Sequence, residues 1–369
     1  MFSIPLYQPS LDGNERKYLN DCLDSTWISS KGKYITDFEK QFAAYAGVKY
    51  ASAVANGTMA LHLALVVMGI GPGDEVIVPT LTYVACANAV LYTGAVPVFV
   101  DSLEQTWQMN PDEVRRKVTA KTRAIMAVHV YGHPCEMDKL TSIAKEYDLY
   151  LLEDCAEAIG ARYKNKLVGS FGDMSVFSFY GNKTITTGEG GMVVTNSEVL
   201  YDRAQRLRGQ GMAANRKYWH DILGYNYRMT NLCAAIGLAQ LERVEYFVCK
   251  KRQIAEWYQE LLSTSPVEFH RETQQVVHSY WMCSILAPDP FRRTLLYDYL
   301  AGKGIETRPL FCPIHTMPRY SQWFGRYRIA ENLAYRGLNL PSWPGLTKGQ
   351  VELICNCILD FFKEQYDGY

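Results

Sequence analysis

Short apolar runs alternate with amphipathic stretches along the first two-thirds of the chain. The runs Asp74–Thr80, Val96–Asp101 and Arg123–Gly132 predict buried strands. Segments between such runs, including Thr58–Gly69 and Glu136–Asp148, carry apolar residues at helical spacing. Strands that alternate with helices predict an α/β fold, with a mostly parallel central sheet and helices on both faces. Ligands bind such sheets at the carboxyl ends of the strands.

The pattern changes after about Asn231. Asn231–Leu262 predicts a long helical stretch that a break near its middle could interrupt. Ser279–Leu286 predicts a strand and Arg293–Gly304 a helix, and a further helix closes the chain. We therefore predict a large α/β domain over residues 1–240 and a smaller C-terminal α+β domain over residues 241–369.

Charge and composition narrow the class of protein. Lys plus Arg equals Asp plus Glu, 38 of each, so no basic excess indicates nucleic-acid binding. The apolar runs are too short to span a bilayer, and the N-terminal residues do not have the pattern of a secretory signal. The ten cysteines include no C-x-x-C motif, which predicts reduced thiols and no metal site. We expect a cytoplasmic protein with no membrane or nucleic-acid partner.

The stretch "FSFYGNKTITTGEGG" places Lys183 between an aromatic strand and a glycine-rich loop. A lysine here could grip a phosphate, bond covalently to a carbonyl, or lie solvated at the surface. Asp154 ends another predicted strand, where an acid can also be a cap or an ion-pair partner. "NGT" (Asn56–Thr58) precedes a helix, which suits a phosphate or an ordinary turn. No P-loop or G-x-G-x-x-G pattern occurs.

Together these residues are more informative than each is alone. An aldehyde cofactor with a pyridine ring and a phosphate needs a lysine for the Schiff base, an acid for the ring nitrogen and a phosphate cup. Lys183 and Asp154 follow strands whose carboxyl ends meet at one rim of the predicted sheet, and "NGT" faces the same rim.

Several long motifs resemble a known family. "EDCAEAIGA", "GDMSVFSFYGNKTITTGEGGMVVTN", "LRGQGM" and "GYNYRMTNLCAAIGLAQL" occur in the order found in the sugar aminotransferases of the DegT/DnrJ/EryC1/StrS family. The resemblance covers nearly the whole chain. It implies a fold-type I transferase that uses pyridoxal 5'-phosphate (PLP).

The resemblance assigns roles around the cofactor ring. Lys183 matches the Schiff-base lysine, and Asp154 matches the acid that pairs with the pyridinium nitrogen. Glu157 matches a position near the 3-hydroxyl, where other members often carry Gln or His. Tyr83 matches an aromatic residue that stacks on the ring. Related dehydratases carry histidine at the lysine position, so Lys183 favours transamination.

The resemblance also implies how the phosphate is held. Gly57, Thr58 and Ser178 match the phosphate cup. Asn226 matches an asparagine that reaches the phosphate bound by the neighbouring subunit. This match implies a homodimer with two shared active sites.

The substrates follow from the resemblance alone. "RGQGM" and "YWHDILGYNYRMTN" are most similar to members that aminate C4 of a GDP-linked 4-keto-6-deoxymannose, with L-glutamate as amino donor. Alternatives are a dTDP- or UDP-linked ketosugar, amination at C3, and a non-catalytic sensor that binds PLP or a nucleotide sugar.

Candidate substrate contacts lie in an N-terminal substrate-facing segment and in a proline-bracketed loop of the smaller domain. They are Ser29, Ser30, Lys31, Arg308 and His315. The first three could instead form a solvated turn, Arg308 an interdomain ion pair, and His315 a loop cap. Tyr218 and Trp219 could pack on a base or sugar, or at a dimer interface.

Overall fold

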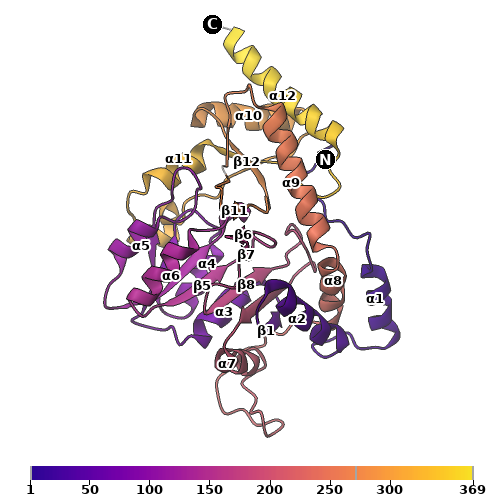
Figure 1. Cartoon of the computed structure of the whole chain (residues 1–369), viewed down its shortest axis with the longest axis vertical. Coiled ribbons are helices and arrows are strands. Elements are labelled where there is room, and N and C mark those ends of the chain that lie inside the picture. The colour runs from indigo at the N-terminus through magenta and orange to yellow at the C-terminus, as the bar shows by residue number, and fades with distance from the viewer. Residues whose placement is uncertain (1, 271, 368–369) are drawn as a thin grey trace.

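A computed structural model describes residues 2–270 and 272–367 of the chain. Seven of the described strands form a central sheet in the order β1-β9-β8-β5-β4-β2-β3. Figure 1 shows this sheet among its helices. In that order they are Tyr50–Val54, Gly191–Thr195, Met174–Ser178, Tyr150–Asp154, Thr122–Val128, Glu75–Pro79 and Val96–Val100. Neighbouring pairs from β8 to β3 are parallel, whereas β9 is antiparallel to both β1 and β8. The predicted mostly parallel sheet is confirmed.

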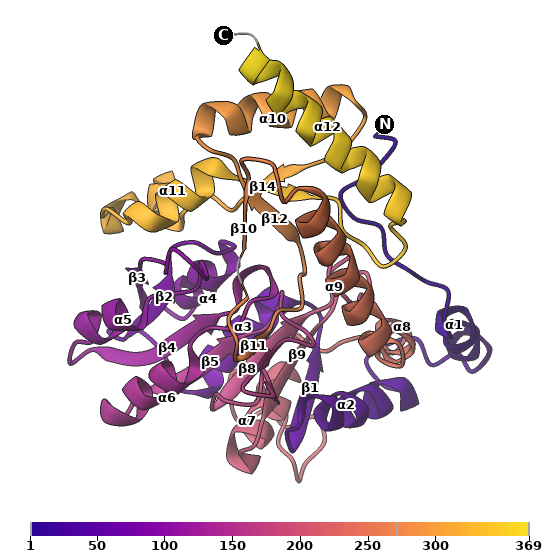
Figure 2. The same ribbon diagram turned by 45° about the horizontal axis from the view of Figure 1, so that its top comes forward.

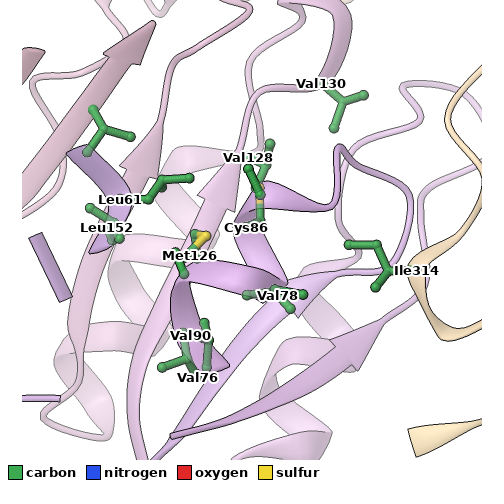
Figure 3. Close-up of a cluster of buried hydrophobic side chains, with 14 of the residues drawn as sticks. Leu61, Val76, Val78, Cys86, Val90, Met126, Val128, Val130, Leu152 and Ile314 are labelled. Carbon is green, nitrogen blue, oxygen red and sulfur yellow. The ribbon is translucent and has the colours of Figure 1, made fainter. Parts of the chain in front are cut away.

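Helices cover both faces of this sheet because its strands are apolar on both sides. In β4, Met126 and Val128 belong to one buried cluster, whereas Ile125 and Ala127 belong to another on the opposite face. The first face carries α3 (Gly57–Val67), α4 (Ala85–Tyr92) and α7 (Glu198–Arg208). The second face carries α2 (Lys33–Ala46), α5 (Pro111–Lys117), α6 (Met137–Glu146) and α8 (Asn231–Leu241). Figure 3 shows part of the first cluster, in which Cys86 of α4 lies beside Val128.

A second unit packs against the carboxyl ends of the sheet (Figure 2). It contains a sheet in the order β10-β12-β14-β13: Glu268–Phe269, Cys283–Leu286, Gly337–Leu340 and Arg308–Pro309. Its helices are α9 (Val244–Leu261), α10 (Pro290–Gly302), α11 (Arg328–Arg336) and α12 (Lys348–Asp367). The N-terminal segment also joins this unit, since Ile4 pairs with Ile305. Within the described residues, no helix has the length and apolarity that crossing a membrane requires.

The predicted long helix is indeed two helices. α8 ends at Leu241 and α9 begins at Val244, so the break falls near the middle of the predicted stretch. The predicted strand from Ser279 is shorter, because β12 begins only at Cys283. Ser279 instead donates its N–H to Gly132 O of the large unit at 3.0 Å, and Tyr280 has a φ of 48°.

Several elements were not predicted from the sequence, among them two helices and a small sheet. Helices α1 (Glu15–Asp24) and α2 precede the first predicted strand. A small sheet of β11 (Val276–Val277), β6 (Arg162–Tyr163) and β7 (Lys166–Leu167) joins the C-terminal part of the chain to the large unit. These contacts connect the two units beside the carboxyl ends of the central strands.

Candidate active site

A cavity of about 490 Å³ lies between the carboxyl ends of the central strands and the second unit. The predicted residues that line it are Gly57, Thr58, Tyr83, Asp154, Glu157, Ser178, Lys183 and Arg308. They come from strand ends, a helix N-terminus and the second unit. The fold therefore assembles side chains that lie as much as 251 residues apart in the sequence, which is the separation of Gly57 and Arg308.

Lys183 lies in the turn that follows β8, and its side chain is only 13% exposed. Its Nζ is 3.5 Å from Glu157 Oε1 and 3.9 Å from the centroid of the Trp281 ring. The Lys183 carbonyl accepts a hydrogen bond from the Tyr7 hydroxyl at 2.5 Å. The backbone of the lysine is thus anchored while its amine points into the cavity.

Asp154 ends β5 and is buried at the floor of the cavity. Its Oδ1 accepts the backbone N–H of Ala156 at 2.9 Å. Its Oδ2 accepts the thiol of Cys86 at 3.2 Å. A thiol is a weak donor, so Oδ2 keeps most of its capacity to accept a stronger hydrogen bond. This geometry suits pairing with a protonated ring nitrogen.

Glu157 is buried beside Lys183, and burial raises the pKa of its carboxyl while the Lys183 charge opposes that rise. Its Oε2 accepts the backbone N–H of Tyr131 at 2.8 Å. Tyr131 has a φ of 58°, a conformation that non-glycine residues adopt rarely. The buried carboxylate is therefore held by one backbone donor and one amine.

The N-terminus of α3 forms a shallow cup against β8. Asn56 caps this helix, since its side chain accepts the backbone N–H of Met59 at 2.9 Å. A Cβ on Gly57 would lie 2.8 Å from Ser178 Cβ, which is closer than two carbon atoms can approach without movement. Gly57 therefore leaves backbone N–H groups and the Ser178 hydroxyl accessible together. The helix dipole favours an anion at this place.

Tyr83 is 57% exposed because its ring faces the cavity mouth. Its ring centroid is 5.8 Å from that of Phe311, which lines the same cavity. Arg308 also lines the cavity and forms an ion pair with Glu306 at 3.1 Å. Both side chains could contact a ligand from the open side.

The remaining predicted residues lie elsewhere among the described residues. Ser29, Lys31 and Asn226 are exposed, and Ser30 is half-buried, outside the cavity lining. His315 is fully buried. Its Nδ1 lies 2.7 Å from Thr80 Oγ1 and its Nε2 lies 3.1 Å from Glu331 Oε1. That arrangement favours the alternative in which His315 anchors its loop.

Tyr218 and Trp219 lie at the surface of this chain. They are 89% and 51% exposed, on a loop that follows α7. Neither side chain lines the cavity described above.

Sequence reasoning missed several side chains that shape the cavity. Trp281 lies under Lys183, Cys86 touches Asp154, and Tyr131 holds Glu157. Each contact joins distant parts of the chain. No local spacing in the sequence signals such a contact.

The side chains around the cavity fit PLP. A buried lysine and a buried carboxylate face the same cavity, and a glycine-limited cup at a helix N-terminus offers donors to a phosphate. Lys183 and Asp154 would hold the two ends of the pyridine ring system, and Gly57, Thr58 and Ser178 the phosphate. The sheet order and this site together define a fold-type I PLP-dependent enzyme.

Comparisons with known proteins give the family. The profile of the DegT/DnrJ/EryC1/StrS aminotransferase family matches residues 9–359. The chain belongs to this family of PLP-dependent sugar aminotransferases. It is similar to the GDP-perosamine synthases of Escherichia coli O157:H7, at 58% identity, and Vibrio cholerae, at 53%. Each alignment covers 98% of this chain and 99% of the relative.

Solved structures agree with this assignment. S. venezuelae DesV superposes with a TM-score of 0.90 at 33% identity, and the alignment covers 94% of each chain. The PLP form of a putative sugar aminotransferase from Streptococcus pneumoniae superposes with a TM-score of 0.93 at 27% identity. That alignment covers 98% of this chain and 99% of the other. The fold class, the enzyme class and the cofactor predicted from the sequence are confirmed.

Proposed function

We propose that the enzyme transfers the amino group of L-glutamate to C4 of GDP-4-keto-6-deoxy-D-mannose. The product is GDP-perosamine, a precursor for O-antigen polysaccharide. The observation that carries this proposal is the near full-length similarity to proteins named GDP-perosamine synthase. The two inward-facing groups, Lys183 and Asp154, support an active enzyme in preference to a non-catalytic sensor.

The chemistry divides between the cofactor and this chain. Bound PLP supplies an electrophilic carbon for amines and a ring that withdraws electrons from the substrate carbon. Asp154 Oδ2 would accept the hydrogen bond of the protonated ring nitrogen and keep that proton in place. Asp154 can do so because its other oxygen is already held by Ala156.

Lys183 acts at its Nζ. With PLP bound, this amine would bond covalently to the cofactor in the resting enzyme and, once released, would take up the α-proton of L-glutamate. Glu157, 3.5 Å away, stabilises the positive charge that Nζ then carries. The same amine returns a proton to carbon when the ketosugar is aminated.

The sugar and nucleotide enter from the open side of the cavity. Arg308 lines this side and would bind a carboxylate or a diphosphate with two hydrogen bonds. Ser29, Ser30 and Lys31 remain proposed contacts, although they lie outside this chain's cavity. The exposure of Ser29 and Lys31 supports a position in the active site of a neighbouring subunit.

We further propose a cytoplasmic homodimer with shared sites, in which Asn226 reaches the phosphate of the partner's cofactor. Three large apolar side chains support this interface, because such side chains are usually covered by a partner when they are exposed on one chain. They are Tyr218, Trp219 and Leu223, which are 89%, 51% and 86% exposed. All ten cysteines are free thiols, which supports a reducing compartment.

A substrate panel tests the proposal. Purified enzyme is incubated with L-glutamate and GDP-, dTDP- or UDP-linked 4-keto-6-deoxysugars, and the mass of the amino product is measured. We expect turnover of the GDP-linked mannose derivative and not of the others. Turnover of a dTDP- or UDP-sugar alone would contradict the specificity, and no turnover of any ketosugar would favour a sensor.

A pair of lysine variants tests the role of Lys183. Lys183→Ala is expected to abolish turnover, because the covalent and proton-transferring amine is lost. Lys166→Ala, which removes an amine that donates to Ser170 O outside the cavity, is the control and should keep turnover. Transamination at an unchanged rate by Lys183→Ala would refute the assigned role.

A further inference from the structure

The Lys183 amine lies against an aromatic face as well as against a carboxylate. Nζ is 3.9 Å from the Trp281 ring centroid, which is within the range of a cation–π contact. Glu157 Oε1 lies 3.5 Å from the same nitrogen. Both partners attract a positively charged nitrogen, and both are buried.

The indole of Trp281 is held in this place by a hydrogen bond and by stacking on neighbouring rings. Its indole N–H donates to Asn182 O at 2.7 Å, the carbonyl directly before Lys183. Its ring plane lies within 8° of that of Tyr131, with centroids 6.1 Å apart. Tyr131 in turn stacks on Phe311, with centroids 5.1 Å apart. The hydrogen bond of the indole N–H therefore fixes the ring relative to Lys183, and the stacking on Tyr131 fixes it relative to the cavity wall.

Two buried histidines, His270 and His278, fix the chain that leads to Trp281. His270 Nε2 lies 2.5 Å from Thr106 O, and a carbonyl can only accept, so this nitrogen carries the proton. His270 Nδ1 must then accept from His278 Nε2–H at 3.2 Å. His278 Nδ1 accepts the N–H of Tyr280 at 2.9 Å, directly before Trp281. Each ring is thereby assigned one neutral tautomer.

We propose that the face of Trp281 is the resting place of the Lys183 amine whenever that amine is protonated and not covalently bound. Trp281 holds the ammonium beside Glu157, and the histidine pair positions the indole. Trp281 thus touches the reacting nitrogen itself, whereas His270 and His278 act through it. This inference rests on the proposed role of Lys183 and adds a residue to it.

These contacts affect where the charged Lys183 Nζ lies. When the amine is released with a proton, the ring face and the carboxylate stabilise the charge and keep the side chain near the cavity floor. Without the ring face, the amine would lose one of its two charge-stabilising partners. The side chain would then leave the cavity floor more often, and acylating reagents would modify it faster.

The test measures the reactivity of Lys183 directly. Full-length protein from which PLP has been removed is exposed to a short pulse of acetic anhydride, and acetylation of Lys183 is quantified by mass spectrometry. We expect Trp281→Leu to be acetylated about 3- to 10-fold faster than the wild type. Trp281→Phe keeps a ring face and is expected within about twofold of the wild type.

A control separates reactivity from access. Phe311→Leu opens the same cavity wall but leaves Trp281 over Lys183, so its acetylation rate should match the wild type. An unchanged rate in Trp281→Leu, or an equal acceleration in Phe311→Leu, would overturn the proposal. Circular dichroism establishes whether each variant is folded. If Trp281→Leu does not fold, the Trp281→Phe variant decides: acetylation of Lys183 more than about threefold faster than in the wild type would overturn the proposal. Because no ketosugar takes part, failure here is distinct from failure of the proposed function.

Discussion

The thiol of Cys86 donates a hydrogen bond to Asp154 Oδ2 at 3.2 Å, in the lining of the cavity whose side chains fit PLP. Cys86 comes from the first turns of α4, and Asp154 ends β5. Burial raises the pKa of the Cys86 thiol well above its usual range, and the Asp154 charge adds to that rise. A protonated thiol is a donor and not a nucleophile.

The first prediction concerns this thiol. Cys86 should resist alkylation by iodoacetamide at pH 8 in the native protein, whereas the exposed Cys249 and Cys312 should react readily. Mass-spectrometric mapping of the alkylated cysteines gives the rates. Denatured protein, in which all ten cysteines react, is the control. Alkylation of native Cys86 as fast as that of Cys249 would contradict the buried, protonated state.

The phosphate cup gives a second prediction. Gly57→Ala places a Cβ 2.8 Å from Ser178 Cβ, and overpacking of this size costs about 1–3 kcal/mol. We expect PLP affinity, measured by fluorescence titration, to fall about 10- to 100-fold. The double variant Gly57→Ala with Ser178→Gly should recover part of that loss, because the clash is gone.

A matched glycine controls for the substitution itself. A Cβ at Gly302 would meet nothing within 4 Å, so Gly302→Ala should bind PLP as the wild type does. If Gly57→Ala binds PLP with unchanged affinity, the close approach of α3 to β8 does not determine how tightly the cup binds the phosphate.

The buried histidine pair predicts sensitivity to acid. Burial lowers the pKa values of His270 and His278 well below 6.5, and the charge of His133 adds to both; Arg252 also lowers that of His278. Below about pH 6.5 the unfolded chain binds more protons than the folded chain, so stability falls as the pH falls. Two such groups give a slope of up to about 2.7 kcal/mol per pH unit.

Urea unfolding between pH 7 and 5 measures this slope. His278→Gln keeps a donor and an acceptor but does not titrate, and it should make the slope shallower. The exposed His220 provides the control, since His220→Gln should leave the slope unchanged. An equal slope in His278→Gln and the wild type would show that other groups cause the loss of stability.

A buried lysine predicts a pH dependence in the same direction, but in a more alkaline range. Lys251 is fully buried, donates to Ser342 O at 2.9 Å, and has a pKa that burial lowers to about 8. Between pH 8 and about 10.5 the unfolded chain retains the proton that the folded chain has released, so Lys251 makes stability rise with pH. Lys251→Met should flatten this rise. Lys250→Met on the same helix should not, and identical profiles for the two variants would exclude burial of the Lys251 charge as the cause.

Much of the fold could be predicted because its signals are local. Apolar runs of strand length alternate with segments whose apolar residues recur at helical spacing, and this alternation predicted the parallel sheet. The helices α1 and α2 were not predicted. β12 proved shorter than its apolar run because Ser279 bonds to Gly132 of the large unit and the N–H of Tyr280 bonds to His278. Partners distant in sequence, and not propensity, decide where such a strand begins.

The sequence by itself determined the lysine, the acid and the helix N-terminus of the site, since each follows a strand of a parallel sheet and such strands end at one rim. Only the tertiary structure decided what surrounds them. Trp281 bonds to a carbonyl 99 residues away, and Cys86 to an acid 68 residues away. Such contacts depend on how segments far apart in the chain pack around the cavity, and no periodicity along one segment encodes that packing.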